Sequence, residues 1–519
     1  MAPAEPNALP FRQKGDVPVF PEERPGWGGY IEWEEYPEKK KKAAEILKQY
    51  DFPVPPEYQF EPMPKTNPML EGVRWKQYHY AMGPTLKDLP DISWKYVQKE
   101  KSPDMIHVLQ FPYNGEPPRE RLVETEITRN SDHFVRNHGG IPEIDPEKYF
   151  LDIGGLVNNP KRITLKELQD ESIFPRQTST VTLQCSGTRR IEQIRQYPGD
   201  GDELINAPWG EGAIATARWT GVSLKKVLKY CGGLKEDGKH LEFYGADTYF
   251  KKGQVSNYVV SVPARKVKVN EVLLAWEMNG EPLPHIHGYP LRVVVMGYIG
   301  ARSCKWLYKI KAIPHESDGV VQKKEYLYYT PQIGKHNANY SNGFSIQTMP
   351  VSSAIMTPLD QEQIIHDGKI RMRGWAYSGS GWPVRVEVSG DGGSIWYEVP
   401  FENMSTKYFH AWRTWWIDLP VDAEGWLEAC VRCWDDALNT QPTYVRSAWN
   451  WDLHVTSSCH RVRIYSINKS KPATARRLKQ VEEAGISLIP ITHPLEIDLE
   501  TDEEYNAVME KRKWRDPVE

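Results

Sequence analysis

The sequence has few cysteines and no long apolar run. Six cysteines in 519 residues are too few for a disulfide scaffold and suit a reducing compartment. The most apolar stretch, residues 291–301, contains Arg292 and is too short to cross a bilayer. Residues 1–20 lack the charged start and apolar core of a secretory signal. We therefore expect no membrane partner and a cytoplasmic location, with the peroxisome and the mitochondrion as alternatives.

Neither positive nor negative charge is in large excess. The 65 Lys and Arg side chains nearly balance the 69 Asp and Glu side chains, and the net charge of −4 gives no global field for a polyanion. A nucleic-acid partner is therefore not expected. At this length a single hydrophobic core is not enough, and the usual domain size suggests about three units.

A zinc ribbon is also disfavoured. The one metal-like spacing is Cys430–Cys433, and a ribbon needs a second such pair, which the sequence does not contain. Residues 426–435 alternate in the manner of a β-strand. We therefore interpret both cysteines as structural.

One cysteine is placed differently from the others. Residues 181–183, two β-branched residues followed by a leucine, predict a buried strand. Ser186, Gly187 and Thr188 predict a turn, and residues 189–197 predict a helix. Cys185 is thus presented at a strand end, close to a helix N-terminus and to two arginines, and each of these favours the thiolate. A thiolate is the ligand that a soft metal prefers.

Two further segments carry polar groups in loops. In residues 133–157, an Arg-Asn-His triplet precedes a Gly-Gly turn, and in residues 273–307 a Gly-broken hairpin presents His287 and Arg292 ahead of a buried strand and a second basic cluster. Two cationic clusters that bracket a strand predict a phosphate site. His285 and His287 lack a third nearby ligand for zinc. Asp247 is expected on a turn.

The composition changes after Pro350. Residues 369–401, and the segments up to about residue 465, alternate with period two around glycine-rich turns, which predicts an antiparallel β-sandwich. Within it, Arg413 stands among tryptophans, where we expect the buried guanidinium to require an anion. Residues 472–485 predict a basic helix in the tail.

Several motifs together resemble the sulfite oxidase and eukaryotic nitrate reductase family. LQCSGTRR (183–190) resembles the molybdenum-cysteine segment, usually LQCAGNRR in the oxidases. The RNH segment at 136–138, the W-x-x-GAI-x-TARW pattern from Trp209 and the run 273–307 resemble further family segments. G-x-A-x-SG-x-G and WNW…RV in the sandwich resemble the family's dimerisation domain.

The resemblance implies an α+β fold class with two domains. A mixed α/β molybdopterin-binding domain is expected over residues 101–335, and an immunoglobulin-like β-sandwich dimerisation domain over 350–465. An extended lead-in, 1–100, with a short helix at 38–50 precedes them, and a tail, 466–519, follows. The implied cofactor is molybdenum–molybdopterin. No haem is expected, because the HPGG-type segment of the small b-type haem domain is missing.

The resemblance also assigns roles to residues. Cys185 is the implied protein ligand to molybdenum. The implied anion pocket and metal surroundings are formed by Arg136, Arg190, Arg413, Trp209 and Tyr326, although Tyr328 remains an alternative register for the tyrosine. The residues assigned to the pterin and its phosphate are Asn137, His138, Asp247, His287, Arg292, Arg302, Ser303 and Lys305. Ser303 departs from the histidine usual in the oxidases, and the loop between Arg190 and Trp209 is a few residues longer than usual.

The function implied is oxidation of sulfite to sulfate in a homodimer, with dioxygen or an external cytochrome as electron acceptor. Arg136, Arg190 and Arg413 come from separate segments, and convergence on one pocket would oppose the charge of the dianion. A nitrate-reducing enzyme is the nearest alternative, favoured by the LNTQP stretch at 438–442 but opposed by Tyr326 and Arg413. A catalytically silent, cofactor-loaded interaction module and a β-sandwich adhesion protein are the alternatives of other classes.

Overall fold

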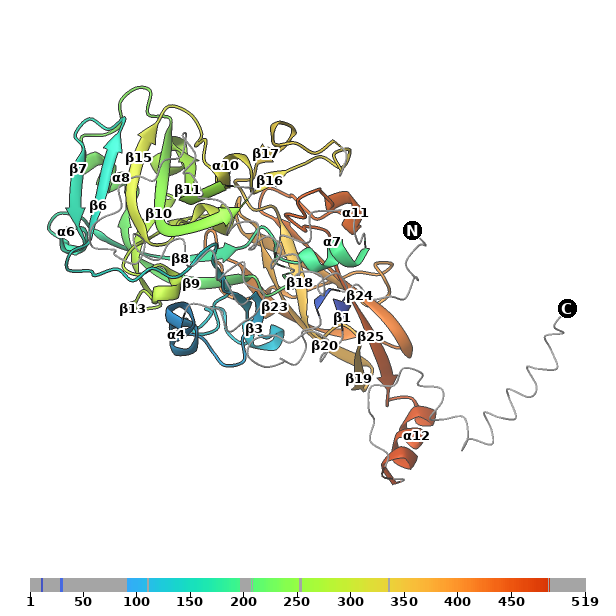
Figure 1. Ribbon diagram of the computed structural model, residues 1–519. Helices are drawn as coiled ribbons and strands as arrows, with labels where there is room; N and C mark the ends of the chain where they lie inside the picture. Colours follow the sequence, from blue (N-terminus) through green and yellow to red (C-terminus); the bar gives the residue numbers. More distant parts are fainter. Residues whose placement is uncertain are drawn as a thin grey trace.

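The computed structural model describes residues 11–12, 29–30, 91–109, 112–196, 207, 209–251, 254–334, 337–483 and 485. The helix expected at 38–50 and the acidic end of the tail lie outside these residues. Figure 1 shows two bodies, a first domain at the upper left and a β-sandwich in orange at the centre and right. No helix among the described residues is long and apolar enough to span a membrane.

The outer sheet of the first domain has five strands. In spatial order they are β11 (Gln254–Pro263), β10 (His240–Lys251), β15 (Leu307–Ile313), β6 (Phe150–Gly155) and β7 (Lys161–Thr164). Every neighbouring pair is antiparallel except β15 with β6, which is parallel. The expectation of mixed α and β structure is confirmed for this domain.

The inner sheet carries the cysteine segment. Its strands are β13 (Glu281–Pro282), β12 (Val272–Met278), β9 (Ile214–Ser223) and β8 (Arg176–Gln184), and β14 (Arg292–Val295) pairs with the other side of β12. Strand β8 is partly exposed at its start but buried over its last four residues. Cys185 follows directly, so the predicted strand end and the helix after it, α7 (Arg190–Gln196), are both confirmed.

The helices of this domain are short connectors. They are α4 (Asp91–Glu100), α5 (Arg119–Leu122), α6 (Leu165–Gln169), α7, α8 (Leu224–Tyr230), α9 (Ala264–Lys268) and α10 (Val320–Lys323), with 3₁₀ turns η4 (His285–His287), η5 (Gly300–Arg302) and η6 (Tyr340–Asn342). The minor strands are β1 (Phe11–Arg12), β2 (Gly29–Tyr30), β3 (Ile106–Leu109), β4 (Asn114–Glu116), β5 (Val135–Arg136), β16 (Leu327–Tyr328) and β17 (Phe344–Ser345).

The second domain is the β-sandwich that the alternation predicts. One sheet is β18 (Ser352–Thr357), β20 (Lys369–Tyr377) and β23 (Arg413–Pro420), and the other is β19 (Glu362–His366), β25 (His460–Asn468), β24 (Gly425–Asp435), β21 (Pro383–Ser389) and β22 (Tyr397–Glu398). In β23, buried and more exposed residues alternate, as one face meets the core. The turn η7 (Phe401–Asn403) and the helices α11 (Val445–Ala448) and α12 (Pro472–Glu483) complete it, and α12 confirms the predicted basic helix.

The Cys430–Cys433 pair lies inside this sandwich. Both cysteines are buried in β24 and neither forms a disulfide. The Cys433 thiol donates to the carbonyl of Ser352 at 3.5 Å. Both side chains thus lie within a strand, as their alternation predicts.

The two domains meet through backbone contacts. The Thr182 N–H donates to His410 O at 3.1 Å, and the Trp412 N–H donates to Thr182 Oγ1 at 2.7 Å. Gly297 of the first domain lies against Gly379 of the second, and a Cβ at position 297 would lie 1.9 Å from the Gly379 carbonyl oxygen. The domains are therefore joined by main-chain packing that side chains would disrupt.

Gly297→Ala tests this junction. Gly297 has φ of 75°, a conformation that costs an L-residue about 1–3 kcal/mol before the clash is counted. We expect a lower midpoint of thermal unfolding. Gly334→Ala is the control, because a Cβ there would have no heavy atom within 4 Å. Equal midpoints for the two variants would contradict the described junction.

Candidate active site

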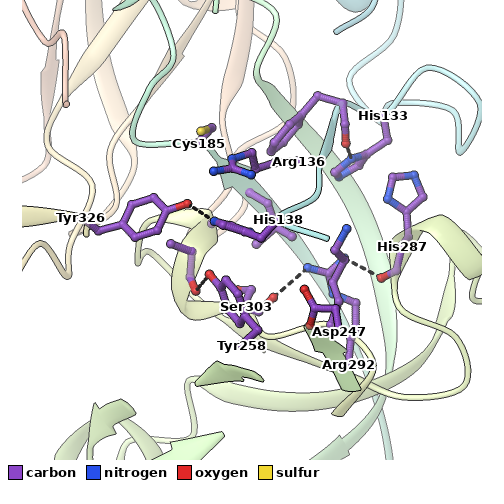
Figure 2. A pocket seen from close by; sticks show the side chains of 15 residues that line it. His133, Arg136, His138, Cys185, Asp247, Tyr258, His287, Arg292, Ser303 and Tyr326 are labelled. Carbon is purple, nitrogen blue, oxygen red and sulfur yellow. Dashed lines mark hydrogen bonds between the residues drawn. The ribbon is translucent and has the colours of Figure 1, made fainter. Parts of the chain in front are cut away.

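One cavity of about 630 Å³, counted with the open space at its mouth, brings together most of the predicted site residues. The site residues predicted from the sequence that line this cavity are Arg136, His138, Cys185, Asp247, His287, Arg292, Ser303, Lys305 and Tyr326. Figure 2 shows Cys185, Arg136 and Tyr326 toward one end and Asp247, Arg292 and His287 toward the other. The cavity therefore has a sulfur end and a cationic end.

Cys185 is presented by a tight turn at the end of β8. The Thr188 N–H and the Thr188 hydroxyl both donate to the Cys185 carbonyl, at 3.0 and 2.8 Å, and close the turn. The Gly187 N–H donates to Cys185 Sγ at 3.4 Å. A Cβ at Gly187 would lie 2.7 Å from Arg190 Nη2, so the guanidinium packs on this glycine. The side chain of Cys185 is buried and only 6% exposed.

Tyr326 and His138 lie beside the sulfur end. Their Oη and Nε2 atoms are 2.5 Å apart, and the His138 ring lies 4.7 Å from the ring of Tyr258. Burial raises the pKa of Tyr326 well above its ordinary value, although Arg136 opposes this. The phenol therefore stays protonated and shares a hydrogen bond with His138. Tyr328 packs on Phe344 outside the cavity lining, which places Tyr326 and not Tyr328 at the site.

The cationic end is built from Arg292 and Lys305. Arg292 donates to the carbonyls of His287 and Ser303 at 2.9 and 3.2 Å, and Lys305 donates to Ile286 O at 3.0 Å and to Asn137 Oδ1. Burial lowers the pKa of Arg292 to about 9 and lowers that of Lys305 as well. These carbonyl contacts fix the cations but do not neutralise them.

Asp247 is the one carboxylate among the described lining residues, and its expected place on a turn is wrong. It lies within β10, where the pairing with β11 shifts between Gly245 and Thr248. The shift leaves Ala246 and Asp247 outside the ladder, and such a bulge re-aims a side chain. Burial raises the pKa of Asp247 to about 7, and Lys305 opposes that rise.

Helix α4 holds the loop that carries His287. The Glu100 carboxylate accepts from the backbone N–H groups of His285 and Ile286, at 3.1 and 2.9 Å, and contacts His285 Nδ1 at 2.9 Å. Gly288, with φ of 115°, turns the chain after this loop, and a Cβ there would approach Lys305 within 3.1 Å. The loop is therefore pinned at both ends beside the cationic end.

Two predicted cofactor residues lie just behind the lining. Asn137 accepts from Lys305, and its Nδ2 is buried without a hydrogen-bond partner. Arg302 donates to Ile346 O at 2.8 and 3.1 Å and to Gln322 at 2.8 Å. Arg302 thus ties η5 to the chain beyond it and does not line the cavity.

The three arginines of the predicted anion pocket do not all converge. Only Arg136 lines the cavity. Arg190 lies behind the cysteine turn and donates to Leu453 O at 2.9 Å and to Ala207 O at 2.6 Å. It nevertheless helps to lower the pKa of Tyr326 against the effect of burial, so its charge is felt at the sulfur end.

Arg413 and Trp209 lie away from the lining. Arg413, which was expected to require an anion, donates to Ser405 O at 2.9 Å and lies over the Phe401 ring at 4.7 Å within the sandwich. Strand pairing with Ala376 fixes it there. Trp209 is fully buried, packs edge-on to Phe134 and belongs to the same apolar cluster as Cys185.

The structure adds residues that the sequence did not single out. His133 and Tyr258 line the cavity, and His454 comes from the second domain. The His454 ring stacks on Tyr326 with centroids 5.3 Å apart, and its Nδ1 lies 3.0 Å from Ser186 Oγ and 3.3 Å from Arg190 Nη2. His454 lies close to the WNW segment of the dimerisation domain, but its distance of 269 residues from Cys185 hid the contact.

A second group of possible metal ligands, Glu192, Glu211 and His460, lies outside the cavity lining. Each carboxylate already has a cation: Arg189 donates to Glu192 at 2.7 Å, and Arg119 pairs with Glu211. We therefore interpret this group as a buried ion-pair network that joins the two domains.

Comparisons with known proteins agree with this arrangement. The sequence model for the oxidoreductase molybdopterin binding domain matches residues 138–321, and that for the Mo-co oxidoreductase dimerisation domain matches residues 343–467. The chain is 39% identical over 365 residues to the mitochondrial sulfite oxidase of Homo sapiens, covering 69% of this chain and 65% of that protein.

The alignment covers a larger share of two further relatives. The sulfite oxidase of Arabidopsis thaliana is 35% identical over 370 residues, covering 68% of this chain and 91% of that protein. The crystal structure of the sulfane dehydrogenase SoxCD from Paracoccus pantotrophus aligns with a TM-score of 0.56 at 26% identity, covering 69% of this chain and 85% of that one. The expected fold class, a molybdopterin-binding domain followed by a dimerisation β-sandwich, is confirmed.

The cavity fits the molybdenum–molybdopterin cofactor that this domain binds. Three lining side chains, Arg136, Arg292 and Lys305, are cationic and only Asp247 is a carboxylate, so the cavity has positive charge to spare for a phosphate. The buried atoms His133 Nε2 and Asn137 Nδ2 lack partners. The thiol of Cys185 at the other end is a ligand type that suits a soft metal.

Glu100→Gln tests the loop that carries His287. Burial raises the pKa of Glu100, but the bonds to His285 and Ile286 outweigh it and hold the pKa below the ordinary 4.5. A carboxyl with a lowered pKa stabilises the fold above its ordinary pKa, and the contribution is lost as the pH falls through the folded value. We expect the wild type to melt above the variant at about pH 5.5 and this gap to shrink toward about pH 3.5. A gap that stays constant with pH would contradict the charge-based role.

Proposed function

The chain belongs to the sulfite oxidase family of molybdopterin oxidoreductases, and from this premise we propose that it oxidises sulfite to sulfate. The observation that carries the proposal is the meeting of Cys185, Arg136 and Tyr326 at one end of a single cavity. Cys185 would be the protein ligand to molybdenum. The other end, with Arg292, Lys305 and His287, would hold the phosphate and the pterin.

Arg136 would bind the substrate. It lines the cavity and is partly exposed, whereas Cys185 and Tyr326 beside it are buried. Its pKa stays above the ordinary value although burial opposes this, because Tyr326 and Cys185 favour the charged form. A guanidinium offers paired N–H donors that match the oxygens of an oxyanion. Arg190, held behind the turn, would add positive field at longer range.

The oxidation of sulfite to sulfate releases two electrons and two protons, which must leave the site. Sulfite and water give sulfate, two protons and two electrons, so each atom and charge is accounted for. When bound, the molybdenum cofactor supplies the two-electron oxidation and the transfer of oxygen. The protein would orient the anion through Arg136, which lines the cavity.

Tyr326 and His138 would handle protons. The protonated phenol and His138 Nε2 are hydrogen-bonded over 2.5 Å, and this contact would give a proton a route away from the sulfur end. His138 is partly exposed and can pass a proton outward. Tyr326 has φ of 52°, and a strained backbone at this position fits a functional side chain.

The electrons would pass to dioxygen or to an external cytochrome. A homodimer is expected from the match to the dimerisation domain.

The second domain also contacts the site itself. His454 stacks on Tyr326, and the Leu453 carbonyl accepts from Arg190. Any movement between the two domains would therefore be felt at the proposed substrate pocket.

Cys185→Ser is the main test. The hydroxyl is a poor ligand for molybdenum, so we expect a folded variant with sulfite turnover reduced by at least about 100-fold, beyond the 10–100-fold typical when the partners of metal ligands are lost. The thiolate-to-molybdenum absorption band should also disappear. Cys231→Ser, at a buried cysteine outside the cavity lining, is the matched control and should keep both. Full activity in C185S would refute the assignment, and turnover of nitrate but not sulfite by the wild type would favour the nitrate-reducing alternative.

Arg136→Gln tests the anion pocket. A hydrogen bond to a charged group is worth about 1.5–3 kcal/mol, so we expect KM for sulfite to rise about 10- to 100-fold with the cofactor still bound. Arg162→Gln, at an exposed arginine on β7, controls for a general loss of positive charge. An unchanged KM in R136Q would remove Arg136 from the proposed pocket.

A further inference from the structure

A buried lysine lies next to the cationic end of the cavity. Lys101 follows helix α4 directly, is only 6% exposed and donates to Asn130 O at 2.5 Å and His133 O at 2.7 Å. Its Nζ also lies 3.0 Å from His287 Nε2. Burial lowers the pKa of Lys101 to about 7 even though Asp132 and Glu100 oppose the shift, so the ammonium form is present below about pH 7. In that form, the three N–H groups of Lys101 match the three acceptors.

When Lys101 is an ammonium, this contact fixes the tautomer of His287. The two carbonyls take two of the N–H groups of Lys101, and the third then donates to His287 Nε2. Burial lowers the pKa of His287 well below its ordinary value, and Lys101 adds to the effect, so the ring is neutral. A neutral ring that accepts through Nε2 carries its proton on Nδ1. His287 thus offers an N–H donor to the cavity that it lines.

His133 has the complementary arrangement. Its Nδ1 lies 2.9 Å from the carbonyl oxygen of Phe134, which only accepts, so Nδ1 carries the proton. Burial, followed by Lys101, lowers the pKa of His133 well below its ordinary value, and the ring is neutral. Nε2 is then an acceptor, and it is buried without a partner on a side chain that is 2% exposed and lines the cavity.

A buried acceptor without a hydrogen-bond partner destabilises the folded protein, and a histidine with only a structural role is not expected to have one. Leaving such a group unsatisfied costs about 1–3 kcal/mol, and most buried polar atoms in folded proteins have partners. The His133 and His287 rings lie 4.9 Å apart, so one ligand can contact both. A ligand with an N–H donor near an acceptor oxygen would satisfy both rings at once.

We propose that His133 is a further cofactor-binding residue, which accepts from an N–H group of molybdopterin while His287 donates to an acceptor of the same molecule, and that Lys101 is the positioning residue that fixes the His287 tautomer. Neither Lys101 nor His133 belongs to the motifs that mark the family in this sequence. The proposal depends on the cavity being the cofactor cavity and not on sulfite as the substrate.

The tautomers are tested in cofactor-free protein. With histidine labelled by ¹⁵N, NMR should show both His133 and His287 protonated on Nδ1, the tautomer less common in solution. Lys101→Met keeps the aliphatic stem but removes the donor, so His287 should move to protonation on Nε2 while His133 stays unchanged. Protonation of His287 on Nε2 in the wild type, or no change in K101M, would overturn the role of Lys101.

Cofactor affinity is tested with His133 variants loaded with molybdopterin. His133→Leu removes the acceptor, and we expect binding to weaken about 10- to 100-fold, measured as pterin fluorescence retained after dialysis. His133→Gln places an oxygen near the position of Nε2 and should recover most of the affinity. His366→Leu, at a buried histidine of the second domain bonded to Ser466, is the control for general loss of stability and should bind as the wild type does.

Each outcome decides the proposal. If a folded H133L variant retains as much cofactor as the wild type, the proposal is overturned. If H133L does not fold, His133→Asn replaces it, because Asn keeps a polar group near Nδ1 but has none near Nε2 and should weaken binding as H133L would. Because retention is measured without turnover, weakened binding in a chain that does not oxidise sulfite would support this inference while refuting the proposed reaction.

Discussion

The arrangement of the site depends on positive charge that is buried without enough carboxylates to balance it. Arg136, Arg292 and Lys305 line one cavity, and Asp247 is the only described carboxylate among them. Backbone carbonyls hold these cations in place, because a carbonyl satisfies an N–H group without neutralising its charge. A fold that keeps such groups dry retains a strong field for an anionic ligand, and this explains why the cavity suits both a phosphate and a small oxyanion.

The second domain contributes to the site as well as to assembly. Residues 450–456 lie on the cysteine turn, where the Val455 N–H donates to Ser186 O at 2.6 Å and the Leu453 carbonyl accepts from Arg190. Leu453 and Val455 have φ of 53° and 55°, which side chains of this kind adopt only when the surroundings enforce it. The position of Cys185 is thus set from both domains, and the sandwich is part of the architecture of the pocket.

The sequence predicted local secondary structure better than it predicted the surroundings of individual side chains. The strand before Cys185, the turn after it and the sandwich strands follow from residue patterns with period two and from glycine placement. Asp247 was expected on a turn, because a bulge within a long strand leaves no local signal. Arg413 was expected to need an anion, because the sequence shows a charge among tryptophans but not the contact with the carbonyl of Ser405.

Sequence alone determined the chemistry available: a thiol at a strand end, two basic clusters around a buried strand, and a family whose members bind molybdopterin. Only the tertiary structure decided which of these groups share a cavity, since residues such as Arg136 and Tyr326 are brought together by packing between distant segments. It also decided the tautomers of His133 and His287, because the carbonyl of Phe134 and the ammonium of Lys101 that fix them act through space. Contacts of this kind depend on three-dimensional distance, and spacing along the chain does not encode them.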